Sequence, residues 1–311
     1  MQEMNSEERK ANQDRVYRKP LKSIPSFSFN EEVAEAFDDM AERSIPFYEE
    51  VQRLTAALAQ RYARPGTNIY DLGCSTGTTI LRLREALSAA GPANVSIRGI
   101  DSSGAMCHRA QAKLGTLGKG ERPDSTIEYC SRDGGWQKER SEAESESAGN
   151  AKMLQRGVSP AKHSELYFSE PSDPEIVIKH GDVMHESIEN CSVVIMNYTL
   201  QFVRPEQRHE LIRRILNGLN PGGVLLLSDK MLQSSTNVSR VFLDIYYDMK
   251  RSQGYSELEI AQKREALENV LVPYRVEEEQ ELLLGTGFSS VDVFFSWCNF
   301  TSFICVKDEL P

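Results

Sequence analysis

The sequence offers little from which a metal or disulfide centre could be built. Its six cysteines include no Cys-x-x-Cys pair, and its five histidines lack the short spacing of a zinc site. Several cysteines stand inside apolar runs, where a free thiol behaves as a small hydrophobic side chain. We therefore expect a protein with reduced thiols and without a bound metal.

Long apolar runs and an excess of positive charge are also missing. No run approaches the roughly 20 residues that a membrane span needs, and residues 1–27 contain no apolar core typical of a signal peptide. The formal net charge is −10. A phosphate-tracking surface needs many Lys and Arg residues, so this charge disfavours direct binding of nucleic acid. These absences predict a cytoplasmic protein that attaches to neither membrane nor nucleic acid.

Two segments are polar and show little hydrophobic periodicity. They are residues 1–27 and residues 116–174, the second being rich in Ser, Glu, Lys and Gly. Such compositions bury too little apolar surface to offset the entropy of ordering the chain. We expect a disordered tail at 1–27, a single domain at 28–311, and a disordered insertion at 116–174 within it. The alternative for the insertion is a regulatory or partner-docking arm.

The remainder alternates β-rich runs with helical patterns. Residues 28–64 have the apolar spacing of two helices. Five β-rich runs follow, at residues 68–72, 96–100, 176–179, 193–197 and 224–228. This alternation predicts parallel strands joined by crossover helices. The last two runs, residues 290–295 and 302–306, are too close for a crossover and should pair antiparallel. The expected α/β fold, a Rossmann-like seven-stranded sheet, resembles that of class I methyltransferases.

A glycine-containing turn follows the first β-rich run. Gly73, Cys74 and Ser75 lie between an apolar strand and a helical pattern. Glycine lets the backbone approach a ligand, and a helix N-terminus supplies free N–H donors, although a purely structural turn has the same pattern. Asp101 and Ser102 end the next run, where an acidic side chain binds ribose hydroxyls. The lack of a full Gly-x-Gly-x-x-Gly pattern favours S-adenosyl-L-methionine over a dinucleotide.

Two later positions are candidates for the same site. Asp182 and Val183 follow the third run and can offer a carboxylate and an N–H to an adenine edge, but a helix N-cap explains Asp182 equally well. Asn197 ends the fourth run, and ligands of open α/β sheets bind outside the carboxyl ends of the strands.

A helix start is also visible near residue 256. Ser256 and Glu259 have the spacing of a capping box. On the helix that follows, Arg264 falls in step with Ile260 on the expected apolar stripe. A buried arginine needs an anion. The alternative is a simple helical pair with Glu268, four residues further on.

Several segments resemble the carboxy-S-adenosyl-L-methionine synthases, over nearly all of 28–115 and 175–306. The phrases that carry this resemblance are Asp39-Met40-Ala41-Glu42-Arg43-Ser44-Ile45-Pro46, Asn197-Tyr198-Thr199-Leu200-Gln201-Phe202, Leu219-Asn220-Pro221-Gly222-Gly223 and Gly254-Tyr255-Ser256-Glu257-Leu258-Glu259-Ile260. The resemblance implies an enzyme that converts S-adenosyl-L-methionine and prephenate to carboxy-S-adenosyl-L-methionine and phenylpyruvate. The product would serve a separate tRNA carboxymethyltransferase that makes 5-oxyacetyl uridine at the wobble position.

The resemblance also implies a set of ligand contacts. They are Tyr48, Gly73, Cys74, Ser75, Asp101, Ser102, Asp182, Val183, Asn197 and Arg264. Arg264 would be the catalytic residue, holding the new carboxylate from the neighbouring subunit of a homodimer. Three features depart from the family: Phe47 stands where a glycine is usual, Asp229 stands where a glutamate is usual, and the insertion is extra. Two other functions remain open, an ordinary S-adenosylmethionine-dependent methyltransferase acting on a small carboxylate and a catalytically silent cofactor-binding module.

Overall fold

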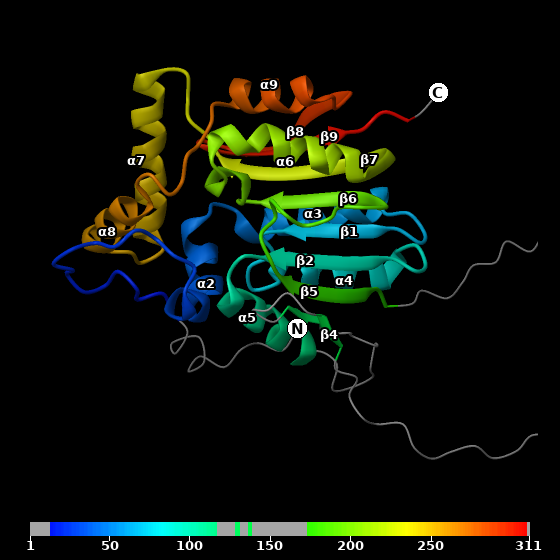
Figure 1. Ribbon diagram of the computed structural model, residues 1–311. Coiled ribbons are helices and arrows are strands. Elements are labelled where there is room, and N and C mark those ends of the chain that lie inside the picture. Colours follow the sequence, from blue (N-terminus) through cyan, green and yellow to red (C-terminus); the bar gives the residue numbers. More distant parts are fainter. Residues whose placement is uncertain (1–12, 117–127, 131–135, 139–172, 310–311) are drawn as a thin grey trace, which may run out of the picture.

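The computed structural model describes residues 13–116, 128–130, 136–138 and 173–309 (Figure 1). Its main sheet has seven strands in the order β5-β2-β1-β6-β7-β9-β8. They are β1 (Asn68–Leu72), β2 (Ser96–Asp101), β5 (Glu175–His180), β6 (Cys191–Asn197), β7 (Leu219–Lys230), β8 (Ser290–Trp297) and β9 (Phe300–Val306). The first five run parallel, and β9 pairs antiparallel with both β7 and β8. The expected fold class, with its antiparallel terminal hairpin, is confirmed.

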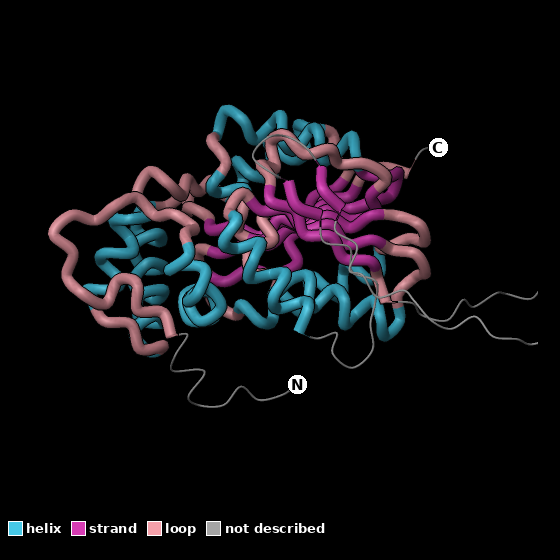
Figure 2. The backbone as a smooth tube through the Cα atoms, turned by 60° about the horizontal axis from the view of Figure 1, so that its bottom comes forward, coloured by secondary structure: helices cyan, strands magenta, loops and turns pink. Residues whose placement is uncertain are grey.

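Helices cover both faces of this sheet, and Figure 2 shows the strands running between the helical layers. On one face lie α3 (Tyr48–Tyr62), α4 (Thr78–Ala90) and α5 (Gly104–Thr116), and on the other lie α6 (Pro205–Gly218) and α9 (Val276–Thr286). Alternate residues of a strand therefore enter different cores. In β6, Val193 and Ile195 pack toward α3 and α4, whereas Val194 and Met196 pack toward α6. Burial on both faces explains why the parallel strands are continuous apolar runs.

Three further helices form a cap at the end to which the parallel strands point (Figure 1). They are α2 (Glu31–Ser44), α7 (Thr236–Ser252) and α8 (Glu257–Leu267). The short helix η1 (Leu200–Phe202), which follows β6, lines the pocket beside them. The Asn30 side chain begins α2 by accepting the N–H of Val33 (3.0 Å). The expected capping box of Ser256 and Glu259 is confirmed, with both of its reciprocal hydrogen bonds present.

The N-terminal segment differs from the expected disordered tail, because residues 13–27 pack against the cap. Tyr17 and Phe27 are buried. The Gln262 side chain of α8 donates to the carbonyls of Tyr17 (2.8 Å) and Lys19 (2.9 Å) and accepts the N–H of Leu21 (2.7 Å). No local pattern predicts this order, since the segment has no periodicity and is held by side chains that are distant in the sequence. Residues 1–12 lie outside the described residues.

The insertion at 116–174 falls mostly outside the described residues, and so does the expectation of its disorder. Its described part includes β3 (Glu128–Cys130) and β4 (Trp136–Lys138), which pair antiparallel. Among the helices in the described ranges, none has both the length and the apolar character required to cross a membrane.

We predict that Gln262→Ala lowers the free energy of unfolding by about 1–3 kcal/mol, because it leaves the buried carbonyl of Tyr17 and two part-buried backbone groups of Lys19 and Leu21 without their partner. Urea denaturation followed by circular dichroism measures this. Gln253→Ala is the matched control, since Gln253 is exposed, and it should change stability by less than about 0.5 kcal/mol. Equal stabilities for the two variants would show that the Gln262 hydrogen bonds do not stabilise the fold.

Candidate functional site

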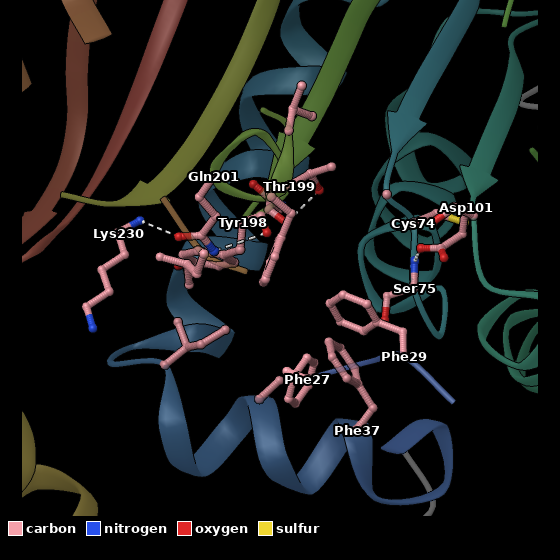
Figure 3. A pocket seen from close by; sticks show the side chains of 18 of the residues that line it. Phe27, Phe29, Phe37, Cys74, Ser75, Asp101, Tyr198, Thr199, Gln201 and Lys230 are labelled. Atoms are coloured by element: carbon pink, nitrogen blue, oxygen red, sulfur yellow. Dashed lines mark hydrogen bonds between the residues drawn. The ribbon is translucent and has the colours of Figure 1, made fainter. Parts of the chain in front are cut away.

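A cavity of about 410 Å³ lies between the cap and the carboxyl ends of the parallel strands (Figure 3). This volume is within the range of small-molecule pockets. Nine of the ten expected ligand positions line it, namely Tyr48, Gly73, Cys74, Ser75, Asp101, Ser102, Asp182, Val183 and Asn197. The tenth, Arg264, does not.

The sheet order arranges the polar groups of the pocket in a row. Asp182 follows β5, Asp101 ends β2, Gly73 follows β1, Asn197 ends β6 and Lys230 ends β7. Because β5, β2, β1, β6 and β7 are successive neighbours, these residues follow one another along one edge. Open α/β sheets bind ligands at this edge.

The turn after β1 is shaped for close contact. Gly73 has a φ of +79°, and a Cβ there would lie 2.3 Å from Thr199 Oγ1, so only glycine fits. Ser75 has a φ of +49°, which is unfavourable for a residue with a side chain, and its N–H donates to Asp101 Oδ2 (2.8 Å). Non-glycine residues held in this region of backbone space cluster at functional sites.

Asp101 is buried and fixed by backbone donors from two loops. Its Oδ2 accepts the Ser75 N–H and its Oδ1 accepts the Ser103 N–H (2.8 Å each). Burial raises the pKa of this carboxyl, and the two hydrogen bonds oppose that effect. Each oxygen keeps a free lone pair, so the ionised group can accept from two adjacent hydroxyls. This geometry fits the ribose of S-adenosyl-L-methionine.

Cys74 does not supply a nucleophile. It is buried, and burial together with the nearby Asp71 raises the pKa of its thiol well above the usual value. Burial and the neighbouring Asp101 also raise the pKa of Asp71, to about 8. A thiol of this kind stays protonated and unreactive. The contribution of Cys74 to the site is therefore its backbone and its surface.

The other two polar positions differ in their surroundings. Asp182 is exposed, and its Oδ1 accepts the Met184 N–H (2.9 Å), which stabilises a turn, while its Oδ2 lies 4.0 Å from His185 Nε2. Asn197 donates from Nδ2 to Thr79 Oγ1 (3.4 Å), while its buried Oδ1 has no partner within the described residues. A buried amide oxygen without a partner is costly and indicates an interaction still to be made.

Sequence reasoning named Tyr48 but missed much of the pocket wall around it. Tyr48, Tyr198, Phe300 and Tyr246 form a continuous aromatic row, with successive ring centroids 6.5, 6.3 and 5.3 Å apart. Phe27, Phe29 and Phe37 form the wall on the cap side (Figure 3), and Lys230 and Lys263 complete the lining. Lys230 could have been found, because it follows a strand at the same edge as Asn197.

Arg264 does not lie on a buried stripe, so the expected phase of its helix is wrong. The buried residues of α8 are Ile260, Gln262, Lys263 and Ala266, and Arg264 is exposed. Successive side chains on a helix are about 100° apart, so a shift of one position places Lys263, and not Arg264, on the buried face. Glu268 ends the helix as its C-cap, and the described residues show no ion pair between it and Arg264. A contact with a neighbouring subunit stays a prediction.

Two departures from the family have local structural consequences. Phe47 has a φ of +53°, a conformation that glycine adopts without strain, and its ring packs near Phe295 (6.0 Å) and Trp297 (6.4 Å). Asp229 is buried, and burial, assisted by Glu279, raises its pKa, while Arg208 and the Gln201 backbone oppose this effect. A glutamate would extend one methylene further. Neither residue lines the pocket.

Comparison with known proteins agrees with this geometry. A family model described as a methyltransferase domain matches residues 44–270. A solved protein of Methanococcus maripaludis, described as a candidate S-adenosyl-L-methionine-dependent methyltransferase, superposes with a TM-score of 0.50 at 16% identity, covering 94% of this chain and 99% of that one. An O-methyltransferase family protein from Burkholderia thailandensis superposes with a TM-score of 0.54 at 12% identity, covering 93% of this chain and 66% of that one. The fold is that of class I methyltransferases, which supports binding of S-adenosyl-L-methionine.

Closer relatives define the family. A protein of Methylococcus capsulatus named carboxy-S-adenosyl-L-methionine synthase is 40% identical over 94% of this chain and 99% of its own length. A protein of the same name from Desulfotalea psychrophila is 38% identical over 91% of this chain and 93% of its own length. The chain belongs to the carboxy-S-adenosyl-L-methionine synthase family, and it is an enzyme of the transferase class. In the described part of the chain, no three His, Cys, Asp or Glu residues are grouped as metal ligands.

We predict that Asp101→Ala weakens S-adenosyl-L-methionine binding by about 1–3 kcal/mol, because ribose hydroxyls lose a buried acceptor. The acceptor must be ionised. Since burial raises its pKa, wild-type affinity should fall as the pH is lowered and begin to do so above the usual carboxyl range. Calorimetry from pH 8 to pH 5 measures both effects. The exposed Asp292→Ala should keep the wild-type profile, and an unchanged affinity for Asp101→Ala would remove Asp101 from the site.

Proposed function

We propose that the protein converts S-adenosyl-L-methionine and prephenate to carboxy-S-adenosyl-L-methionine, phenylpyruvate and water. The observation that carries this proposal is the membership of a family of that name together with one pocket lined by nine of the expected ligand positions. The beginning of the row, from Asp182 to Gly73, is allotted to the cofactor. The end of the row, toward Lys230, leaves room for the co-substrate.

The proposed chemistry needs no nucleophile from the chain. As the prephenate ring becomes aromatic, its carboxylate leaves as carbon dioxide and its ring hydroxyl leaves as hydroxide. The hydroxide removes a proton from the sulfonium methyl group, forming water, and the resulting ylide carbon forms a bond with the carbon dioxide. The protein contributes positioning and exclusion of water. The aromatic row and the protonated Cys74 thiol support this division of work.

The proposed assembly is a homodimer in which Arg264 reaches the pocket of the partner subunit. An exposed Arg264 outside its own pocket is consistent with a role across an interface. The adjoining helix α7 exposes Val238 (40%), Val241 (55%) and Ile245 (41%) at the spacing of one helix face. An unpartnered apolar helix face of this kind marks an interaction surface. We assign it to a second copy of the chain.

The proposed product has a use outside this protein. A separate tRNA carboxymethyltransferase would take the carboxylated cofactor and make 5-oxyacetyl uridine at the wobble position. The net charge of −10 supports an indirect link to tRNA, because a chain this acidic is poorly suited to tracking phosphates. The corresponding place of action is the cytoplasm.

Mass spectrometry of small molecules from a reaction with S-adenosyl-L-methionine and prephenate tests the proposal. We expect carboxy-S-adenosyl-L-methionine and phenylpyruvate in equal amounts, with no product when prephenate is left out. A methylated carboxylate and S-adenosylhomocysteine would instead identify an ordinary methyltransferase. Bound cofactor without any turnover would identify a silent binding module.

We predict that Arg264→Ala weakens binding of carboxy-S-adenosyl-L-methionine by about 2–5 kcal/mol, because truncation leaves the new carboxylate without its bidentate partner. Binding of S-adenosyl-L-methionine should change by less than about 0.5 kcal/mol. Arg264→Lys should recover only part of the loss, since an ammonium cannot make the planar two-point contact. Glu268→Ala is the control. Equal small losses for both ligands would contradict the assignment.

We predict that Val241→Lys converts the dimer to a monomer, because it places a charge in the middle of an apolar interface. Light scattering after size-exclusion chromatography measures the mass. Asn217→Lys is the control, because it introduces the same charge at an exposed position of α6, and this variant should stay dimeric. A wild-type protein that elutes as a monomer would contradict the proposed homodimer and the role of Arg264 across its interface.

A further inference from the structure

Two lysines lie at the β7 end of the pocket, beyond the residues allotted to the cofactor. Lys230 ends β7, Lys263 comes from α8, and both line the cavity. Lys263 is only 8% exposed and donates its Nζ to Ser44 Oγ (3.1 Å). The Lys230 ammonium lies over the Tyr246 ring, 5.0 Å from its centroid. Within the described residues, neither ammonium forms an ion pair with a carboxylate.

A third lysine, Lys250, contacts the same Tyr246 ring as Lys230. Lys250 is only 4% exposed, and its Nζ lies between the rings of Tyr246 (5.6 Å) and Tyr255 (5.2 Å). Burial, together with the charges of Lys263 and Lys230, lowers the pKa of Lys250 to about 7. Burial lowers the pKa of Lys263 to about 8. Three lysine side chains are thus gathered where burial disfavours their charged forms.

Few carboxylates oppose them. Asp39 is bonded to Arg43 (2.6 Å), so its charge is already matched. Asp14 accepts the Tyr255 hydroxyl (2.6 Å) and faces Lys250 and Lys263, and Glu259 also acts on Lys250. Positive charge therefore exceeds negative charge at this end of the pocket. Such an excess is costly in a buried site unless a ligand brings an anion.

We propose that Lys230 and Lys263 bind the carboxylate of the α-keto acid side chain of the co-substrate, the carboxylate that remains in the product. This assignment rests on the proposed function. In the aromatic row, Tyr198 and Phe300 connect Tyr48, an expected cofactor position, with Tyr246, over which Lys230 lies, and their rings offer an apolar surface for the six-membered ring of the same molecule. The ring would then face the methyl group and the side chain would point to the lysines.

The chemistry of the two prephenate carboxylates separates their environments. The ring carboxylate loses its charge as it becomes carbon dioxide, so a cation beside it would stabilise the reactant more than the transition state. The side-chain carboxylate keeps its charge throughout. Cations there bind the reactant and the transition state equally and therefore affect KM rather than kcat. Aromatic walls suit the first group, and buried ammonium groups suit the second.

Phenylpyruvate is the probe, because it has the side-chain carboxylate and lacks the ring carboxylate. Calorimetry on the full chain saturated with S-adenosyl-L-methionine measures its affinity for wild type, Lys230→Met and Lys263→Met. Each variant should bind phenylpyruvate about tenfold or more weakly, the size of a lost charged hydrogen bond. The prephenate KM should rise by a similar factor, with kcat and the cofactor dissociation constant changed less than about threefold.

Two controls keep the test independent of folding. Lys22→Met, an exposed lysine outside the pocket, should match wild type throughout. Lys230→Arg keeps the charge and should bind phenylpyruvate within about threefold of wild type. Unchanged phenylpyruvate affinity in both methionine variants, or a fall in kcat at constant KM, would overturn the lysine assignment while the proposed function stands. If the wild type binds phenylpyruvate through the lysines but makes no carboxylated cofactor, the lysine assignment stands and the proposed function is wrong. If the wild type neither binds phenylpyruvate nor makes the carboxylated cofactor, both are wrong.

Discussion

The arrangement of the site depends on the parallel pairing of five strands. Parallel pairing brings the carboxyl ends of β5, β2, β1, β6 and β7 to one edge, so residues from distant parts of the sequence become neighbours in a fixed order. The apolar interior of the sheet holds that register, because a shift of one residue would turn buried side chains toward the wrong face. The chemistry of the pocket is therefore set by which polar residue ends each strand.

The parts of this arrangement that local sequence encodes were predictable. The strand from Asn68 to Leu72, the turn at Gly73 and the acidic end of β2 at Asp101 each have a signal within a few residues, either an apolar run or a residue type that a turn demands. Their positions relative to one another follow from the rules of parallel sheets. The capping box at Ser256 is local in the same sense.

The parts that depend on tertiary contacts were not predictable. The segment before Phe27 has no periodicity, and it is ordered by residues far along the chain, among them Gln262 and Tyr255. The phase of α8 was wrong because a helix of 11 residues with few apolar positions gives no clear stripe, and the buried position belongs to Lys263, a residue that sequence patterns treat as exposed. Whether a charged side chain can be buried depends on the groups that it faces in the fold, and the pattern of apolar residues along the sequence does not reveal those groups.

The cap joins the two halves of the chain through one polar network. Lys263 donates to Ser44, Ser44 donates to the Tyr255 hydroxyl (3.3 Å), and Tyr255 donates to Asp14. During synthesis, residues 13–44 emerge from the ribosome long before α8 exists. The nascent protein therefore cannot complete its ligand pocket until α8 and Phe300, which also lines the pocket, have emerged. Completion of the pocket is a late event in the life of each molecule.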